Sequence, residues 1–264
     1  MNKQDFLKKY VRNDEDYIPL AQILDKCAVM NRTGAVTSTV FLNERQRVLA
    51  EQMLQEVDSA VHTCFGGYPD AERRIILFLP DWAKENPSVY APLSYIRASW
   101  SEKSGVKIGH RDFLGALMGA GIRRETVGDI LPNQTSCDFI VLQSIAPYLM
   151  QNFFSAGRVT LSLAEITAEE LFVPEKDVRT IQDTVASLRL DSIVGAGFGL
   201  SREKAATLIR SGRVIVGGLV CEKPDRQLMG GETVSARGFG KFRLSEDSHT
   251  TKKGRIGITI EKYI

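Results

Sequence analysis

Basic side chains beside a predicted helix start are the residues of this sequence best suited to chemistry. Ser201 precedes an apolar pattern with helical spacing, which makes it a natural N-cap, and Arg202 and Lys204 fall in the first turn. The free backbone N–H groups of a first turn already favour an anion, and the two cations add to that attraction. This segment therefore predicts a phosphate-binding site.

Further Lys and Arg residues extend the predicted site along the C-terminal third. Arg210 and Arg213 lie about two to three helical turns after Arg202, so these cations cannot form one narrow stripe. They would instead grip a nucleic acid backbone from two sides, which suits structured RNA recognised by shape. Arg189 either contacts phosphate or pairs with Asp191 within the fold. The predicted RNA-binding residues are Arg189, Ser201, Arg202, Lys204, Arg210, Arg213, Arg237, Lys241, Lys252, Lys253 and Arg255.

The stretch Arg237–Phe242, RGFGKF, resembles the start of the RNP1 pattern of RNA-recognition motifs. Lys241 stands where that pattern needs an aromatic ring to stack on a base, so the stretch is not an RNP1. Gly238 and Gly240 predict a sharp turn, and Phe239 either packs in the fold or contacts a base. A second basic edge is expected from Arg237, Lys241, Lys252, Lys253 and Arg255.

Three short strings are typical of enzymes, but each lacks the context that its chemistry needs. His110-Arg111-Asp112 is not followed by the Asn of a kinase catalytic loop. Val194–Gly199 resembles a dinucleotide-binding glycine loop, but Leu200 occupies its last glycine position and no strand precedes it. Arg189–Asp191 lacks the neighbours of a pseudouridine synthase motif. The histidines and cysteines show no ligand spacing, so we expect no catalysis, metal, cofactor or small-molecule substrate.

Charge is distributed unevenly along the chain. Residues 181–264 carry 14 Lys and Arg against 9 Asp and Glu, a net charge of +5, whereas the remaining residues carry 20 against 23, a net charge of −3. This asymmetry indicates a nucleic acid partner for the C-terminal third. Isolated cysteines, a charged N-terminus and the lack of any apolar run of about 18 residues indicate a cytoplasmic protein with no membrane partner.

Hydrophobic periodicity predicts an α+β protein. Helical spacing dominates the N-terminal part and is interrupted at Pro19, and an apolar strand follows at Arg74–Leu79. Near the C-terminus, Ser187 is expected to cap a short helix, and Gly217-Gly218 suits a tight hairpin. The expected parts are a helical N-terminal domain (1–72), a small α+β domain (73–166), a connector (167–182) and a C-terminal domain (183–264).

The middle domain offers a second group of cations at helix ends. His110 and Arg111 open a predicted helix, and Arg123 and Arg124 follow Gly121 just past its end. Two interpretations stay open: these residues contact RNA, or they are a satisfied cap with surface arginines.

The order of residues over 189–255 resembles the S4 RNA-binding domain family. The carrying segments are R-L-D, L-S-R-E-K-A-A, S-G-R-V-x-V-G-G, V-S-x-R-G and T-K-K-G-R. The resemblance implies two short helices packed on a small, strongly bent sheet, and an RNA contact by Arg202. The sequence departs at Gly217, where Asn is usual, and at Gly231-Glu232, where Gly-Asp is usual; both lie away from the helices.

HRDFLGALMG (110–119), GIRRE (121–125) and GDI (128–130) look like the middle domain of the YlmH family of bacterial S4 proteins. This wider resemblance covers essentially the whole chain. It implies binding to rRNA and tRNA on large ribosomal subunits that carry an obstructed peptidyl-tRNA, in the quality-control pathway that adds alanine tails to stalled chains, with other quality-control factors as further partners. An RNA-modifying enzyme targeted by an S4 domain, and a cell-division interaction protein, are the alternatives.

Overall fold

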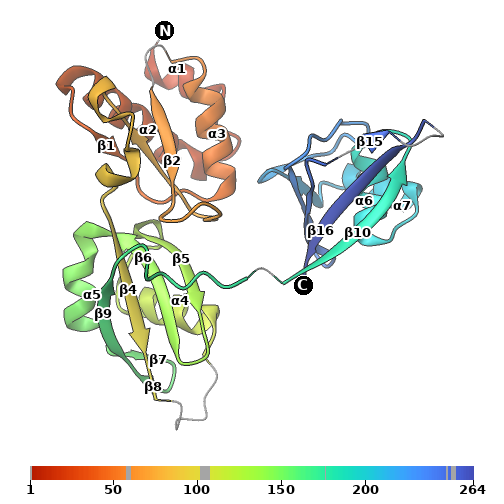
Figure 1. Cartoon of the computed structure of the whole chain (residues 1–264). Coiled ribbons are helices and arrows are strands. Elements are labelled where there is room, and N and C mark those ends of the chain that lie inside the picture. The colour runs from red at the N-terminus through yellow and green to blue at the C-terminus, as the bar shows by residue number, and fades with distance from the viewer. Residues whose placement is uncertain (1, 58–60, 102–107, 176, 248, 251–253) are drawn as a thin grey trace. The chain divides into compact units, whose positions relative to one another are not determined.

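A computed structural model describes residues 2–57, 61–101, 108–175, 177–247, 249–250 and 254–264. The chain divides into two compact units, unit 1 up to Pro174 and unit 2 from Glu175 to Ile264, which are described separately (Figure 1). Both units mix helices with sheets, so the α+β class is confirmed.

The first part of unit 1 is a lobe of three helices and a small sheet, not the purely helical domain that the sequence predicts. Helix α2 continues through Pro19, because burial of Leu20 and Ile23 beyond the proline holds the helix together. Asn13 and Asp16 form a capping box at the start of α2. Arg45 donates to both carboxylate oxygens of Asp16. The lobe contains α1 (Lys3–Lys8), α2 (Asp14–Thr33), β1 (Thr37–Ser38), α3 (Glu44–Leu54), β2 (His62–Phe65), β3 (Ile75–Phe78) and two 3-10 turns, η1 (Asp81–Ala83) and η2 (Pro87–Tyr90).

Strand β3 corrects the predicted boundary at residue 72. Its four side chains are fully buried, as expected for a buried strand, but it lies between β1 and β2 in an antiparallel sheet with the order β1-β3-β2. The strand therefore completes the N-terminal lobe instead of opening the middle domain. Its partners lie about 10 to 40 residues away along the chain, and local periodicity carries no information about them.

The middle part of unit 1 is a four-stranded antiparallel sheet with the order β5-β6-β4-β9. One face of the sheet packs against α4 and α5, through Phe113, Leu117 and Leu149. The elements are β4 (Leu93–Ser99), α4 (His110–Gly119), η4 (Arg124–Thr126), β5 (Val127–Pro132), β6 (Ser136–Leu142), η5 (Gln143–Ile145), α5 (Ala146–Asn152), β7 (Ser155–Ala156), β8 (Val159–Thr160) and β9 (Ser162–Ile166).

A buried carboxylate joins the lobe to the middle sheet. Asp129 on β5 accepts hydrogen bonds from the Tyr68 hydroxyl at 2.8 Å and from the backbone N–H groups of Glu72 and Arg73 at 2.7 and 3.0 Å. Burial, and then the nearby Asp129 charge, raise the pKa of Tyr68 well above its usual range. The two parts of unit 1 are thus fixed to each other by satisfied buried polar groups.

The side chain of Arg73 makes a second joint at the same place. It donates from Nε to Val127 O at 3.0 Å and from Nη2 to Phe41 O at 2.9 Å. Burial, and then the positive charge of Arg124, lower the pKa of Arg73 to about 10. Gly128 lies against the Phe41 ring so closely that an added Cβ would come within 2.8 Å of it. Arg73 therefore acts as a structural cross-link.

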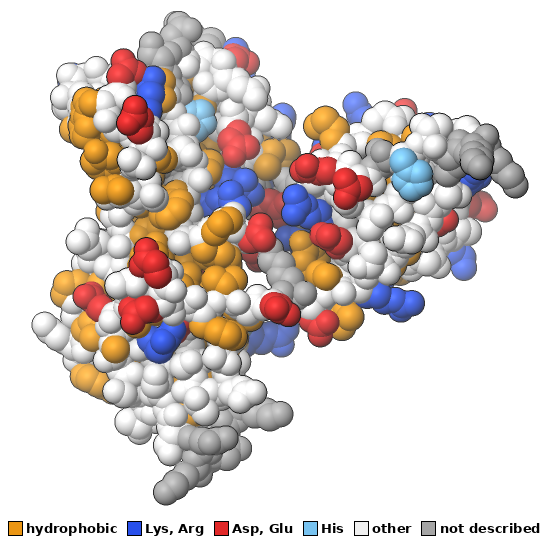
Figure 2. Space-filling view, viewed as in Figure 1, with side chains coloured by type: hydrophobic (Ala, Val, Ile, Leu, Met, Phe, Trp, Pro, Cys, Tyr) orange, Lys and Arg blue, Asp and Glu red, His pale blue; other side chains and the backbone are white. Residues whose placement is uncertain are grey.

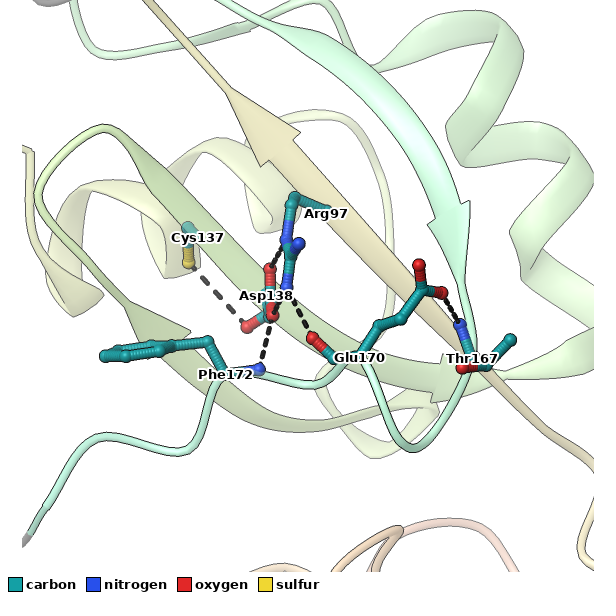
Figure 3. A network of polar contacts seen from close by, with 6 residues as sticks. All are labelled: Arg97, Cys137, Asp138, Thr167, Glu170 and Phe172. Atoms are coloured by element: carbon teal, nitrogen blue, oxygen red, sulfur yellow. Dashed lines mark hydrogen bonds and ion pairs between the residues drawn. The ribbon is translucent and has the colours of Figure 1, made fainter.

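The segment after β9 is attached to the other face of the middle sheet (Figure 3). Arg97 on β4 and Asp138 on β6 form a bidentate pair, with both N–O distances 2.7 Å. Arg97 also donates to Glu170 O at 2.6 Å, and the Phe172 N–H donates to Asp138 at 2.7 Å. Residues 167–172 therefore belong to unit 1, which corrects the predicted connector at its first end.

Unit 2 contains two helices and one extended antiparallel sheet with the order β10-β16-β14-β13-β11-β12. Strand β10 pairs over all eight residues with β16, so Val178–Gln182 are sheet and not connector. The elements are β10 (Val178–Val185), α6 (Leu190–Phe198), α7 (Arg202–Arg210), β11 (Val214–Val216), β12 (Leu219–Val220), β13 (Thr233–Ala236), β14 (Gly240–Leu244), β15 (His249–Thr250) and β16 (Ile256–Tyr263). Helices α6 and α7 cover one sheet face, with Leu190, Ile193, Ile209 and Phe242 in the core.

Candidate nucleic-acid interface

Helix α6 begins two residues later than Ser187 would place it, because a neighbouring loop binds its first turn. Arg189 is the N-cap, and the N–H groups of Leu190 and Asp191 donate to Arg226 O and Pro224 O at 2.8 and 2.9 Å. The orphan donors of this helix start are thus used within the fold. The consequence is that the α6 N-terminus is a structural joint and offers nothing to an anion.

Asp191 is the organising group of the candidate interface, although it is 97% buried. Arg189 donates to both of its oxygens at 3.2 and 2.9 Å, and Arg202 lies with Nε 3.3 Å from the same carboxylate. Burial alone would raise the pKa of Asp191, but the hydrogen bonds and charges of the two arginines outweigh it and lower the pKa. One carboxylate thus holds two guanidinium groups.

The Nε atom of Arg202 contacts Asp191, but most of the Arg202 side chain is exposed to solvent. Its side chain is 61% exposed, whereas that of Arg189 is half as exposed at 33%. Of the two readings left open for Arg189, the ion pair within the fold is the one that the geometry supports. Arg202 is positioned without being neutralised by a partner of its own, which is the state expected of a phosphate contact.

Helix α7 starts as predicted. The Ser201 hydroxyl accepts from the Lys204 N–H at 3.3 Å, and the helix runs from Arg202. The approach of Arg202 to Asp191 depends on Gly195, because Leu200 N–H donates to Gly195 O at 2.9 Å and an added Cβ on Gly195 would stand 3.0 Å from Leu200 O. Gly195 and Gly197 of the VGAGFG string are therefore packing residues, and Gly199 ends α6 with a φ angle of 68°.

Arg255 lies beside Arg202, which corrects the predicted second basic edge. It donates to the hydroxyl of Thr184 at 3.1 Å and to the carbonyl of the same residue. Arg202 and Arg255 line one open groove of about 400 Å³ together with Asp183, Asp191 and Thr184. Sequence order could not reveal this grouping, since β10 brings Thr184 to the end of β16. Lys252 and Lys253 lie outside the described residues.

The remaining cations of the predicted edge form a different group. Arg213 donates from Nη2 to Arg237 O at 3.2 Å, across β11 and the β13–β14 turn. Arg210 is exposed in the last turn of α7, and Lys241 lies 5.8 Å from the Tyr263 ring centre. Figure 2 shows Lys and Arg side chains at several edges of unit 2, interspersed with acidic ones. The cations thus form two groups, at the two ends of α7.

The RGFGKF segment is the β13–β14 hairpin. Gly238 and Gly240 have φ angles of 87° and 94°, so the predicted glycine turn is confirmed. The Phe239 ring centre lies 5.6 Å from that of Phe198, and Phe239 packs against the core of unit 2. Packing is therefore the reading that the geometry supports for Phe239.

The middle-domain cations divide into inward and outward groups. Arg124 donates to Val127 O and Gly128 O at 2.6 and 3.2 Å, so its guanidinium stabilises the fold. Arg123 is exposed and pairs with Glu125 at 3.4 Å.

His110 and Arg111 open α4 at the surface. Partial burial, and then the charge of Arg124, lower the pKa of His110. Together with Arg123, these two residues leave an outward surface on which RNA contact stays a prediction.

Metal binding and membrane crossing were each considered for the described part of the chain. No group of three or more His, Cys, Asp or Glu side chains there could hold a metal ion. Among the helices that the structure describes, none is both long and apolar enough to cross a bilayer.

Comparisons with known proteins identify the family of this chain. A family described as "Putative RNA-binding domain in YlmH" matches residues 95–170, and the S4 domain matches residues 188–234. "Ribosome-associated protein quality control protein P2" of Bacillus subtilis (strain 168) is 31% identical over 254 residues, which are 96% of this chain and 97% of that protein. The chain belongs to the YlmH family. The S4 match contains α6, α7 and the Asp191 cluster.

A solved structure extends the YlmH likeness to the fold. "Cell division protein ylmH from Streptococcus pneumoniae" aligns with a TM-score of 0.51 at 20% identity, covering 61% of this chain and 96% of that one. The matched families point to an RNA-binding protein rather than an enzyme.

Proposed function

We propose that this chain is a non-catalytic factor that binds rRNA and tRNA on the large ribosomal subunit and acts in quality control of stalled nascent chains, where alanine tails are added. The Bacillus subtilis relative is named as a ribosome-associated quality control protein, and the match covers nearly the whole of both chains. The observation that carries the proposal is the exposed Arg202 guanidinium, held over the buried Asp191 beside the start of α7. A cytoplasmic location follows from such a role.

The first RNA contact would be made at the start of α7. Lys204 and Arg202 supply charge there, and the free N–H groups of the first turn supply hydrogen bonds to the same phosphate. Arg255, across the groove, would bind the next phosphate along the backbone.

Arg210, Arg213 and Arg237 would make a second contact, displaced along α7 by about 12 Å, the length of eight helical residues. Two contacts at that separation read the shape of a folded RNA and no base sequence. Affinity should therefore fall steeply with salt.

The test removes the first contact. Arg202→Ala with Lys204→Ala should abolish co-sedimentation with large subunits in a sucrose gradient, because both cations of the α7 start are lost. The matched control is Lys223→Ala with Arg243→Ala, which removes the same charge from unit 2 at residues outside α7 and outside the proposed RNA contacts. Equal sedimentation of a folded Arg202/Lys204 variant and the control would contradict the proposal.

A separate measurement addresses catalysis. Mass spectrometry of rRNA and tRNA from cells with and without the gene should show identical modifications. A modification that disappears with the gene would favour an RNA-modifying enzyme.

A further inference from the structure

The N-terminal lobe carries an exposed aromatic patch that RNA binding by unit 2 does not use. Trp82, Val89 and Tyr90 are 64%, 75% and 38% exposed, on the consecutive turns η1 and η2. The Trp82 and Tyr90 rings contact edge to face, with their centres 5.4 Å apart, so each ring supports the other. Figure 2 shows hydrophobic side chains gathered over the side of the lobe that carries β1. Ordered Trp and Tyr side chains are typical centres of protein interfaces.

Two cavities beside the patch share three of their lining residues and are here together called the β1 groove. The smaller, about 470 Å³, is lined by Trp82, Tyr90 and residues 35–38. The larger, about 690 Å³, continues towards α2 and residues 142–144. Lys26, Ser38 and Pro92 line both cavities, which places Ser38 at the centre of the groove.

Strand β1 presents unpaired backbone groups to this groove. In the described residues it has β3 as its only strand neighbour. Thr39 N–H donates to Ile76 O at 3.0 Å, so the backbone groups of Thr37 and Thr39 point to β3, and those of Ser38 point the opposite way. Within the described part of the chain, no backbone hydrogen bond joins Ser38 N–H or C=O to a residue outside the sheet. Such an edge can pair with an added strand.

The charge at the groove selects among occupants. Asp25 is paired with Lys3 at 2.5 Å, whereas no carboxylate in the described residues contacts Lys26, which is exposed at the wall shared by both cavities. The groove therefore has one uncompensated positive charge next to apolar surface. The lobe as a whole, residues 1–92, carries 11 Lys and Arg against 13 Asp and Glu, which disfavours a polyanion such as RNA.

We propose that the β1 groove binds an extended segment of a partner protein by strand addition to β1. The segment would hydrogen-bond to Ser38, place alternate apolar side chains in the two cavities and against Trp82, and present an Asp or Glu to Lys26. Alternation follows from the strand itself, since successive side chains point to opposite sides. The surface is independent of the RNA contacts of unit 2.

A display library of random linear peptides, panned against the full chain, supplies the probe. Enriched sequences should alternate apolar residues and contain an acidic one. A synthetic peptide of the enriched sequence should bind about tenfold more weakly to Trp82→Ala and to Lys26→Glu, because each removes a central contact. Phe154→Ala, which removes another exposed aromatic ring, and Lys223→Glu are matched controls and should bind normally.

A backbone test separates strand addition from simple burial of side chains. N-methylation of the peptide at one residue should abolish binding, while methylation of the next residue should leave it unchanged, because only alternate N–H groups face β1. Amide exchange at Ser38 should slow when the peptide binds.

Four results would overturn the proposal: no enriched pattern, equal affinity for Trp82→Ala, displacement of the peptide by RNA, or a concentration-dependent dimer that Trp82→Ala makes monomeric.

Discussion

Two arginines of unit 2 and two arginines of unit 1 differ in the groups that they bind. In unit 2, Arg189 and Arg202 share the single carboxylate of Asp191, and most of the Arg202 side chain remains exposed. In unit 1, Arg73 and Arg124 both donate to the backbone carbonyl of Val127, the first residue of β5. The first arrangement keeps positive charge at the surface, and the second uses it inside the fold.

This difference teaches that the partner of an arginine, and not its place in a basic string, indicates its role. Unit 2, residues 175–264, carries 16 Lys and Arg against 11 Asp and Glu, whereas residues 1–174 carry 18 against 21. Removing Arg73 or Arg124 should therefore cost stability in unit 1, and removing Arg202 should cost RNA affinity in unit 2. Each prediction below tests one side of that contrast.

The largest effect is expected for Arg73→Ala. The variant leaves the Phe41 carbonyl without its charged donor and removes one of the two arginine donors to the Val127 carbonyl, the other being Arg124, so unit 1 should lose about 3 kcal/mol of unfolding free energy. Both tryptophans, Trp82 and Trp100, lie in unit 1, so their fluorescence during denaturant unfolding measures this unit alone.

Arg123→Ala is the matched control for Arg73→Ala, because Arg123 is exposed and pairs only with a surface carboxylate among the described residues. Its free energy of unfolding should stay within about 0.5 kcal/mol of that of the parent protein. Equal losses in the two variants would remove the contrast between structural and surface arginines.

The second effect concerns affinity. Arg202→Ala should weaken binding to isolated large subunits about tenfold and reduce the slope of log K against log salt by about one, because one phosphate contact is lost. Stability should change little, since Arg189 still pairs with Asp191. Filter binding over a salt series measures the affinity and the slope. Arg243→Ala, with the same charge loss, should leave the slope unchanged; a shared slope would mean that only net charge matters.

The third prediction uses acid. Because the pKa of Asp191 is lowered in the fold, its contribution to the stability of unit 2 is fully present above about pH 4, the pKa of an unfolded aspartate, and is lost as the pH falls through the lower folded pKa. Circular dichroism between pH 5 and 2 should show this loss, and Asp191→Asn should have a flatter profile. RNA affinity should not change between pH 6 and 8 through this group; an Asp191→Asn profile with the parental slope would contradict the assignment.

Local features of this fold were predictable from sequence, and non-local pairings were not. Ser201 as an N-cap and the Gly238/Gly240 turn depend on a few adjacent residues, whose types determine the local backbone. The sequence does not identify residues 178–182 of β10 as a strand. Most side chains of β10 are exposed and polar, as an edge strand allows, and its partner β16 is about 80 residues away.

The candidate site follows the same rule. The cations of the S4 part could be named from their positions, but their division into a group with Arg255 and a group with Arg237 depends on contacts between distant strands. The ion pair between Asp191 and Arg202 spans the α6–α7 turn and has no periodic signature. The sequence shows which residues are basic. The pairing of distant strands in the sheet determines which of them lie close together.

The smallest effect tests how Arg202 is positioned, and it comes from Gly195→Ala. Alanine favours the α6 helix by about 1 kcal/mol over glycine, but its Cβ would stand 3.0 Å from Leu200 O, so the α6–α7 turn must shift by a few tenths of an ångström. The two terms oppose each other, and stability should change by less than about 1 kcal/mol. Affinity for large subunits should still fall about threefold, because the shifted turn carries Arg202 away from Asp191 while every cation remains. Unchanged affinity would show that charge alone binds RNA, and that the Asp191 support is needed only for folding.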